Sequence, residues 1–339
     1  MKDRNLRTKC IGVLAATVIS FLIPGFTQSP YWMHIFINIW ISIIVTASLR
    51  FIINMGEWSF AHVPLMGMGA YTSALLVMKL GLSFWLALPL AALITAVISI
   101  VIYLPCLPTT GTFFFFSSYA FGEVMRLCWI KFKDPFGGPA GLILIPPPNP
   151  IHIPGFSSIK FGYLSKIPYY YLSLVCMLFS LFLLYRLEKS RLGSIAEAIR
   201  ESNLLSQFVG IKVWRYKMVI LVIGSAFAGI AGSIYAHYTT LIMPVDFYWG
   251  LGVYIIIYAT VGGTRHFAGP IVGVILFVFL RELLRPIVMY VPLVYGLILA
   301  ITLTFMPEGL TGLTEKFFDR SKKGELAKAE GTNEDATAF

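Results

Sequence analysis

Residues 185–238 read YRLEKSRLGSIAEAIRESNLLSQFVGIKVWRYKMVILVIGSAFAGIAGSIYAHY, and this stretch decides the fold. Its first part, Arg186 to Lys217, carries seven Lys or Arg residues against three Glu. Its second part, Met218 to Tyr235, is apolar and rich in small residues. A charged, helix-prone loop that lies between two membrane spans can dock a soluble partner, so we expect a membrane protein with such a loop.

The composition indicates a polytopic α-helical membrane protein. Of the 339 residues, 58% are hydrophobic and 12% are charged, whereas soluble domains carry about 25% charged residues. Several apolar runs reach the ~20 residues that a helix needs to cross a bilayer. A transmembrane β-barrel would show short alternating segments instead. The net charge of +10 is concentrated at helix ends, which favours contact with anionic lipid over binding of nucleic acid.

Apolar periodicity and length predict about ten transmembrane or partly inserted helices. Their expected ranges are 10–26, 33–53, a third that starts near Glu57 and Ser59, 84–104, 112–130, 169–184, 217–238, 248–261, 271–284 and 292–305. Ten crossings place the N-terminus, the charged loop 186–217 and the C-terminus on one side, which the positive-inside rule makes cytoplasmic. The four Lys residues of the opposite loop 131–168 conflict with this rule. We expect a transmembrane domain over 1–313 and a polar cytoplasmic tail over 314–339.

The sequence contains no motif for catalysis. There is no phosphate-binding loop of the type G-x-x-x-x-G-K-[ST], so we expect no ATP hydrolysis by this chain. The four Cys and five His residues have no metal-binding spacing, and no cofactor is expected. Ionisable residues at membrane depth are costly, and they include two i,i+3 pairs, Glu123 with Arg126 and Glu282 with Arg285. Each pair is interpreted first as a structural contact.

Small residues predict two packing features. Gly224, Ala228 and Gly232 recur every fourth position, and Ser225, Gly229 and Ser233 repeat the pattern one residue later. This is a helix face for close contact with another helix. Gly262-Gly263 and Gly269-Pro270 interrupt the helical pattern, and a break at membrane depth is tolerated where it lines a cavity or is buried.

The charged loop predicts one amphipathic helix. Ser194 can cap its N-terminus, with Glu197 completing a capping box, and Gly210 can terminate it after Val209. The apolar residues of this segment recur at helical spacing. The spacing fits equally well a helix that lies on the membrane surface and one that inserts into a groove of a cytosolic protein.

Six sequence blocks occur in the order known from one family. They are NMGEWSFAHVPLMGMGAYTSALL (54–76), YAFGEVMR (119–126), FGGPAGLILIPPP (136–148), the loop and helix 191–236, VGGTRHFAGPIVG (261–273) and MPEGLTGL (306–313). Together they resemble the permease subunits of bacterial ABC importers for branched-chain amino acids, specifically the M-type subunit of Liv-like systems. The resemblance covers about residues 54–313.

The resemblance implies half of a translocation path in the bacterial inner membrane. It implies as partners a second permease subunit, two cytosolic ATPases and an extracytoplasmic binding protein, and it favours the ATPase groove as the destination of the loop helix. The residues that correspond to the ATPase-coupling segment are Glu197, Ala198, Ile199, Arg200, Glu201 and Gly210. The residues that we expect along the path are Gly67, Gly69, Tyr71, Glu123, Gly262 and Gly263.

Three departures from the family pattern leave the substrate open. Leu205-Ser206 stands where an Ala-Ala pair is usual, Thr264-Arg265 replaces a small residue and Gly, and Pro139-Ala140 replaces a more polar dipeptide. Related permeases serve urea, short amides and other small solutes. Two alternatives come from other classes: a self-sufficient secondary transporter, and a membrane-embedded enzyme or scaffold. The missing proton-relay acids and the missing catalytic cluster count against them.

Overall fold

The computed structural model describes residues 17–25, 29–150, 161–162, 166–306 and 309–312, and its regular structure is almost entirely helical. The helices are α2 (Pro30–Ile53), α3 (His62–Leu80), α4 (Phe84–Tyr103), α5 (Thr112–Lys131), α6 (Lys133–Phe136), α7 (Ile167–Glu188), α8 (Arg191–Glu201), α9 (Asn203–Phe208), α10 (Val213–Thr239), α11 (Trp249–Gly262), α12 (Gly269–Leu283) and α13 (Val291–Phe305). Shorter elements are the 3₁₀ turns η1 (Gly138–Ala140), η2 (Pro244–Phe247) and η3 (Arg285–Tyr290) and the strands β1 (Leu142–Ile143) and β2 (Leu241–Ile242). The predicted all-α fold is confirmed.

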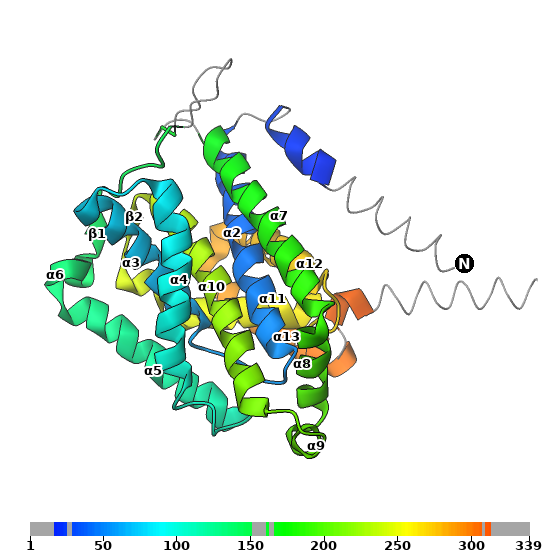
Figure 1. Cartoon of the computed structure of the whole chain (residues 1–339). Coiled ribbons are helices and arrows are strands. Elements are labelled where there is room, and N and C mark those ends of the chain that lie inside the picture. The colour runs from blue at the N-terminus through cyan, green and yellow to red at the C-terminus, as the bar shows by residue number, and fades with distance from the viewer. Residues whose placement is uncertain (1–16, 26–28, 151–160, 163–165, 307–308, 313–339) are drawn as a thin grey trace, which may run out of the picture.

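Two helices form the centre of the bundle. Helix α10 packs against α2, α3 and α4, and α2 also packs against α7, α11 and α12. Most of α2 is buried on all sides, as expected for a helix whose whole surface is apolar. Figure 1 shows these central helices running between the two ends of the molecule, with α8 and α9 at one end and β1 and β2 toward the other.

The predicted small-residue face of α10 is confirmed as its packing surface. Gly69 of α3 lies so close to α10 that a Cβ there would be 2.4 Å from the Cα of Gly229. A Cβ on Gly232 would be 1.9 Å from the carbonyl oxygen of Met66. Only residues without a side chain allow two helix backbones to approach this closely. The glycines therefore fix how α3 and α10 pack.

The helices match the predicted apolar runs, with shifted ends. Six stretches of the described residues are long and apolar enough to cross a membrane: α2, α3, α4, α7, α10 and one that begins with α13. Helix α11 is apolar but has only 14 residues, and α12 has 15. The predicted start of the third helix near Glu57 and Ser59 is wrong, because α3 begins at His62 and both residues are buried in the preceding loop. Of the predicted first span, 10–26, residues 17–25 are described and are helical. The rest of that span and the tail 314–339 lie outside the described residues.

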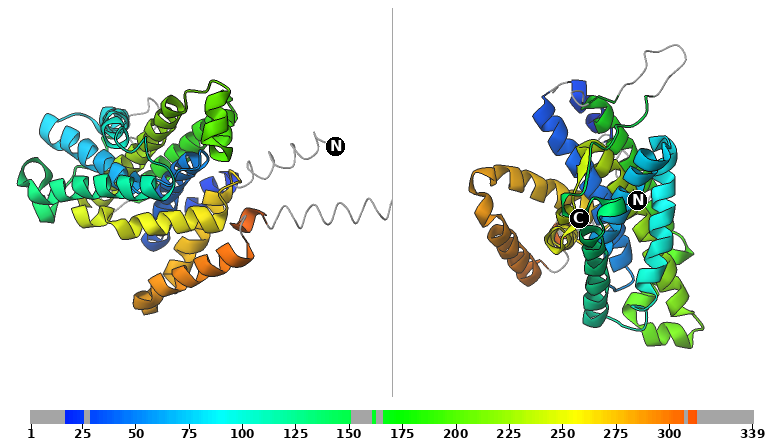
Figure 2. Two further views of the ribbon diagram at one scale, coloured as in Figure 1. Left: turned by 90° about the horizontal axis from the view of Figure 1, so that it is seen from below. Right: turned by 90° about the vertical axis from the view of Figure 1, so that its left-hand side faces the viewer.

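The remaining elements cover the ends and one side of the bundle. Strands β1 and β2 pair antiparallel, with Leu142 opposite Ile242, and so tie the loop after α5 to the loop after α10. Prolines 146–148 and 150 lie outside any helix or strand, as their fixed φ and missing N–H predict. Helices α12 and α13, gold to orange in Figure 2, form an arm at one side of the molecule.

Candidate functional site

The charged loop forms two short helices rather than the single predicted one. Ser190 caps α8 by accepting a hydrogen bond from the Leu192 amide at 3.2 Å, and Ser202 caps α9 by accepting one from the Leu205 amide at 3.2 Å. The prediction of one helix from Ser194 to Val209 is therefore wrong. A serine side chain that bonds the backbone two or three residues later favours a new helix start over continuation of the old helix.

The α8–α9 segment (residues 191–208) is packed on one side and open on the other. Gly193, Ala196 and Ile199 of α8 are buried against the bundle. In contrast, α9 and the residue after it expose large apolar side chains: Leu204 (62% exposed), Leu205 (66%), Phe208 (78%) and Val209 (82%). An exposed apolar cluster of this kind is a candidate contact surface for a partner.

The predicted coupling residues lie partly on the exposed side and partly on the buried side of this segment. Glu197, Arg200 and Glu201 are exposed, Ala198 is half-buried, and Ile199 is buried. Gly210 ends α9 with a φ of +88°, a conformation that glycine adopts without strain. The role of Gly210 as a helix terminator is thus confirmed, whereas the coupling role of these residues stays a prediction.

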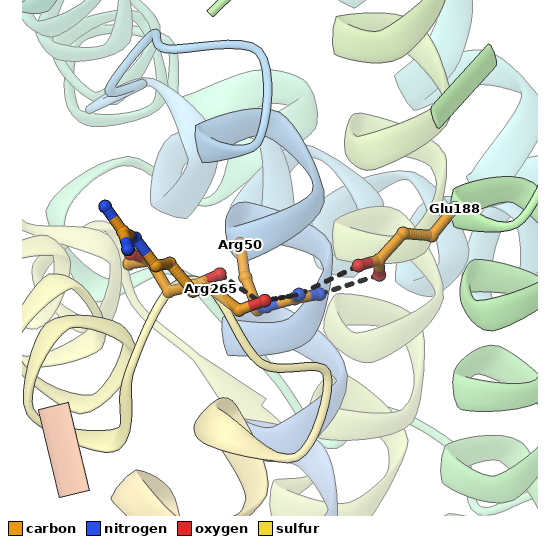
Figure 3. Close-up of polar contacts among 4 residues, drawn as sticks. Arg50, Glu188 and Arg265 are labelled. Carbon is orange, nitrogen blue, oxygen red and sulfur yellow. Dashed lines mark hydrogen bonds and ion pairs between the residues drawn. The ribbon is translucent and has the colours of Figure 1, made fainter. Parts of the chain in front are cut away.

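A buried arginine holds the start of the α8–α9 segment. The guanidinium group of Arg50, at the end of α2, bonds both carboxylate oxygens of Glu188 at 2.8 and 2.9 Å (Figure 3). The same group donates to the carbonyl oxygens of Thr264 at 2.9 Å and Arg265 at 3.3 Å. The Arg50 side chain is only 2% exposed. It therefore joins three parts of the chain: α2, the end of α7 and the loop between α11 and α12.

A second buried ion pair holds the chain that follows α9. Lys217, in the first turns of α10, donates to a carboxylate oxygen of Glu57 at 2.5 Å. The other oxygen of Glu57 accepts a hydrogen bond from the Gly111 amide at 3.1 Å. Both side chains are less than 5% exposed. A buried charge needs such a partner, because an ion that is removed from water is otherwise strongly disfavoured.

Two of the predicted path residues, Gly67 and Tyr71, lie in an aromatic cluster. The ring of Tyr71 stacks on Trp129 with centroids 4.7 Å apart and also contacts Phe247. Gly67 makes room for this cluster, since a Cβ there would be 2.6 Å from Trp129. The Tyr71 hydroxyl is buried and has no hydrogen-bond partner among the residues that the structure describes. A buried hydroxyl without a partner is costly and marks this position as a candidate for ligand contact.

The other predicted path residues lie elsewhere. Gly69 faces α10, as described above, and Gly262 and Gly263 are buried where α11 ends. A Cβ on Gly262 would be 2.0 Å from the carbonyl oxygen of Gly269, so the break predicted here is a tight backbone contact. Glu123 is half-buried and pairs with Arg126 within α5, through two bonds of 3.0 Å from Nε and one of 2.5 Å from a terminal guanidinium nitrogen. The structure does not bring the six residues into one site.

The turn η2, next to the aromatic cluster, contains a carboxylate. Asp246 accepts a hydrogen bond from the Met243 amide at 2.8 Å and thereby closes this turn. Burial raises the pKa of Asp246 above its ordinary value. Within the described ranges, no group of three or more His, Cys, Asp or Glu side chains is placed to hold a metal ion.

The sequence alone does not predict the two buried ion pairs that hold the chain before and after the α8–α9 segment. Arg50 lies within the predicted span 33–53 and Lys217 belongs to the predicted charged loop 186–217, yet both are buried and paired. Their partners lie 138 and 160 residues away, beyond the reach of a local pattern. One signal was present: Arg50, Glu188 and Lys217 each stand at the edge of an apolar run.

Comparison with known proteins now identifies the family. Residues 33–306 match the family model described as the permease component of the branched-chain amino acid transport system. The chain belongs to this family. Two relatives, from Salmonella typhimurium and Escherichia coli K12, are each named high-affinity branched-chain amino acid transport system permease protein LivM. Each is 28% identical in an alignment 311 residues long, and the alignment covers 86% of this chain and 72% of the relative.

No solved structure gives a significant match. The permease family and the apolar helices together make this chain a multi-pass membrane protein and a transport component. The family match begins within α2 and extends to the end of α13. It therefore includes both buried ion pairs, the whole α8–α9 segment and the aromatic cluster around Tyr71.

Proposed function

We propose that this chain is a permease subunit of an ATP-driven importer of branched-chain amino acids. The observation that carries the proposal is the exposed apolar cluster of α9 at one end of a bundle that belongs to the permease family. The relatives from Salmonella typhimurium and Escherichia coli carry the substrate class in their names. In this proposal the α8–α9 segment docks a cytosolic ATPase, and nucleotide binding there moves the permease between its outward- and inward-facing states.

The charges at the α8–α9 end support its placement in the cytoplasm. The cations in and beside the segment that reach solvent are Arg186, Lys189, Arg191, Arg200, Lys212 and Arg215. Loops with such an excess of Lys and Arg stay on the cytoplasmic side of a membrane. We propose the same side for the N-terminus and for the tail 314–339, with 1–313 as the transmembrane domain and the bacterial inner membrane as its location.

The partner set follows from the same proposal. A permease component of a transport system requires the other components, which we propose are a second permease subunit, two cytosolic ATPases and an extracytoplasmic binding protein. The docking geometry favours a protein groove over the lipid surface for the α8–α9 segment. The apolar side of α8 is already buried against the bundle. Helix α9, whose large apolar side chains are exposed, lies at the tip of the molecule (Figure 1).

Phe208→Asp is expected to weaken ATPase binding about 10- to 100-fold. Burying one large apolar side chain stabilises a contact by roughly 1.5–3 kcal/mol, and an Asp in a closed interface adds the cost of an unpaired charge. The measurement is the amount of ATPase that copurifies with the solubilised complex. Gln207→Asp is the matched control, since Gln207 is an exposed neighbour and the same charge is introduced. Equal loss in both variants, or no loss in either, contradicts docking through the apolar cluster.

Tyr71→Phe tests the proposed translocation path. The variant keeps the ring that stacks on Trp129 and removes only the buried hydroxyl. If the hydroxyl bonds the ammonium or carboxylate group of the passing leucine, its loss removes one hydrogen bond to a charged group, of about 1.5–3 kcal/mol. Transport measured over a range of leucine concentrations should then show KM raised about 10- to 100-fold. An unchanged KM and an unchanged maximal rate remove Tyr71 from the path.

A further inference from the structure

The two buried ion pairs lie at the two ends of the α8–α9 segment. Glu188 is the last residue of α7, three positions before α8 begins, and Lys217 follows α9 in the first turns of α10. Their partners are Arg50, in the last turn of α2, and Glu57, in the loop that leads from α2 to α3. We call residues 50–57, the last turn of α2 with the first part of this loop, the α2–α3 link. One link therefore binds the chain on both sides of the proposed docking segment.

A third contact joins the same two parts of the molecule directly. Gly56 of the α2–α3 link lies against α8, where a Cβ would be 3.3 Å from Cγ of Arg200. Gly56 has a φ of +89°, a backbone conformation that favours glycine. The start of α8 is even closer to the end of α7, since a Cβ on Gly193 would be 1.9 Å from the carbonyl oxygen of Glu188. A shift of α8 toward either contact would therefore displace Glu188 or the α2–α3 link.

Arg50 extends this connection toward the helix break. Figure 3 shows its guanidinium group between the Glu188 carboxylate and the backbone carbonyls of the loop that joins α11 to α12. The guanidinium is planar and rigid, so bonds on its two edges keep a fixed mutual geometry. A displacement of Glu188 is thus passed to Thr264 and Arg265. These two residues directly follow Gly262 and Gly263, where α11 ends in tight contact with α12.

We propose that Arg50 is a positioning residue that transmits movement of the α8–α9 segment to the α11–α12 loop. The α2–α3 link receives the movement through Glu188 and Lys217, and Arg50 passes it on through its bonds to the carbonyls of Thr264 and Arg265. This inference rests on the proposed function, because it requires the segment to be the docking site of an ATPase. It adds a specific route from that site into the transmembrane bundle.

The test uses Arg50→Lys in the complete importer complex reconstituted in liposomes. Lysine keeps the positive charge opposite Glu188, but it lacks the planar fork that holds the carboxylate and the loop carbonyls together. We expect the complex to assemble and to hydrolyse ATP, while leucine imported per ATP hydrolysed falls about tenfold, within the usual range of coupling between sites. A purely structural role would lower assembly, uptake and hydrolysis together. The ratio of leucine imported to ATP hydrolysed would then stay unchanged.

The matched control is Arg126→Lys. Arg126 also binds a carboxylate in the helical bundle, but its partner Glu123 lies on the same helix, so this pair joins no separate elements. The ratio of import to hydrolysis should stay close to that of the unaltered complex. A ratio that falls equally in Arg126→Lys, or that stays unchanged in an assembled Arg50→Lys complex, overturns the proposal.

A second variant covers the case in which Arg50→Lys fails to assemble. The exchange Arg50→Glu with Glu188→Arg preserves an ion pair between α2 and α7 and places a carboxylate against the loop carbonyls. We expect the exchange to recover assembly but not the ratio of import to hydrolysis. Recovery of both would show that only the ion pair matters and would overturn the role of the loop bonds.

Failure of the proposed function would look different. If the unaltered complex shows no ATP-dependent import, or if the ATPases do not bind the chain, the proposed function fails before any variant is compared. If the unaltered complex imports leucine and Arg50→Lys does so with the same ratio, only the role of Arg50 fails.

Discussion

Lys217→Met is expected to lower the free energy of unfolding by about 3–5 kcal/mol, because removal of one partner leaves a buried charge uncompensated. Glu57, less than 5% exposed, would keep only the bond from the Gly111 amide. The measurement is the thermal unfolding midpoint of the detergent-solubilised chain, which should fall by several degrees or more. Because the pair also fixes the α2–α3 link to α10, the variant should lose uptake as well.

Two further variants separate the buried pair from a general effect of losing a lysine. Lys212→Met removes an exposed lysine five positions earlier and should leave the unfolding midpoint nearly unchanged. Glu57→Met combined with Lys217→Met removes both charges and should be more stable than Lys217→Met alone, since replacing a whole buried pair by apolar residues is often neutral or stabilising. A double variant that is less stable than the single one contradicts this explanation.

Gly69→Val is expected to destabilise the bundle by about 3 kcal/mol, the upper part of the range for overpacking. The new side chain would start 2.4 Å from the Cα of Gly229 and 2.4 Å from its carbonyl oxygen. These are backbone atoms of a central helix, so the clash is relieved only if α3 and α10 separate. The expected result is a strong fall in the amount of folded protein recovered by size-exclusion chromatography after solubilisation.

Gly296→Val is the control for this substitution. Gly296 is an exposed residue of α13. A Cβ at this position would meet no atom within 4 Å apart from its chain neighbours and the backbone of its own helix. The same change of residue type should therefore leave recovery close to that of the unaltered chain. A similar loss from both variants would mean that valine itself, rather than the contact with Gly229, causes the defect.

The spans and the packing face were predictable because they depend on local properties. A bilayer sets the length of an apolar run, and the ranges predicted for α4 and α5 agree with the observed helices to within one residue. Small residues every fourth position on α10 likewise predict a close helix contact. Gly210 was predictable as a helix end, since a residue with positive φ is most often glycine.

Helix starts were less predictable because several polar residues compete for them. The loop 190–202 offers serines at 190, 194 and 202. Serines 190 and 202 became caps, and Ser194 lies inside α8. Glu and Ser are both common at helix starts, so Glu57 and Ser59 predict one. They are instead held in a loop, Glu57 by Lys217 and Ser59 by a hydrogen bond of 2.6 Å to Tyr103.

The buried charge network was not predictable from the sequence alone. An Arg, Glu or Lys at the edge of an apolar run is usually exposed at the membrane surface. Arg50 and Lys217 are buried because packing of α2, α7 and α10 brings residues from distant parts of the chain beside them. That packing depends on the whole fold, and local periodicity carries no information about it.

The central claim is best tested by leucine uptake into proteoliposomes that contain the chain with its proposed partner permease and ATPases. We predict uptake that requires ATP inside, requires the binding protein outside, and is competed by isoleucine and valine. It should be lost in Phe208→Asp and kept in Gln207→Asp. Leucine uptake by this chain alone under an ion gradient, or competition by urea or short amides instead of isoleucine and valine, would contradict the account.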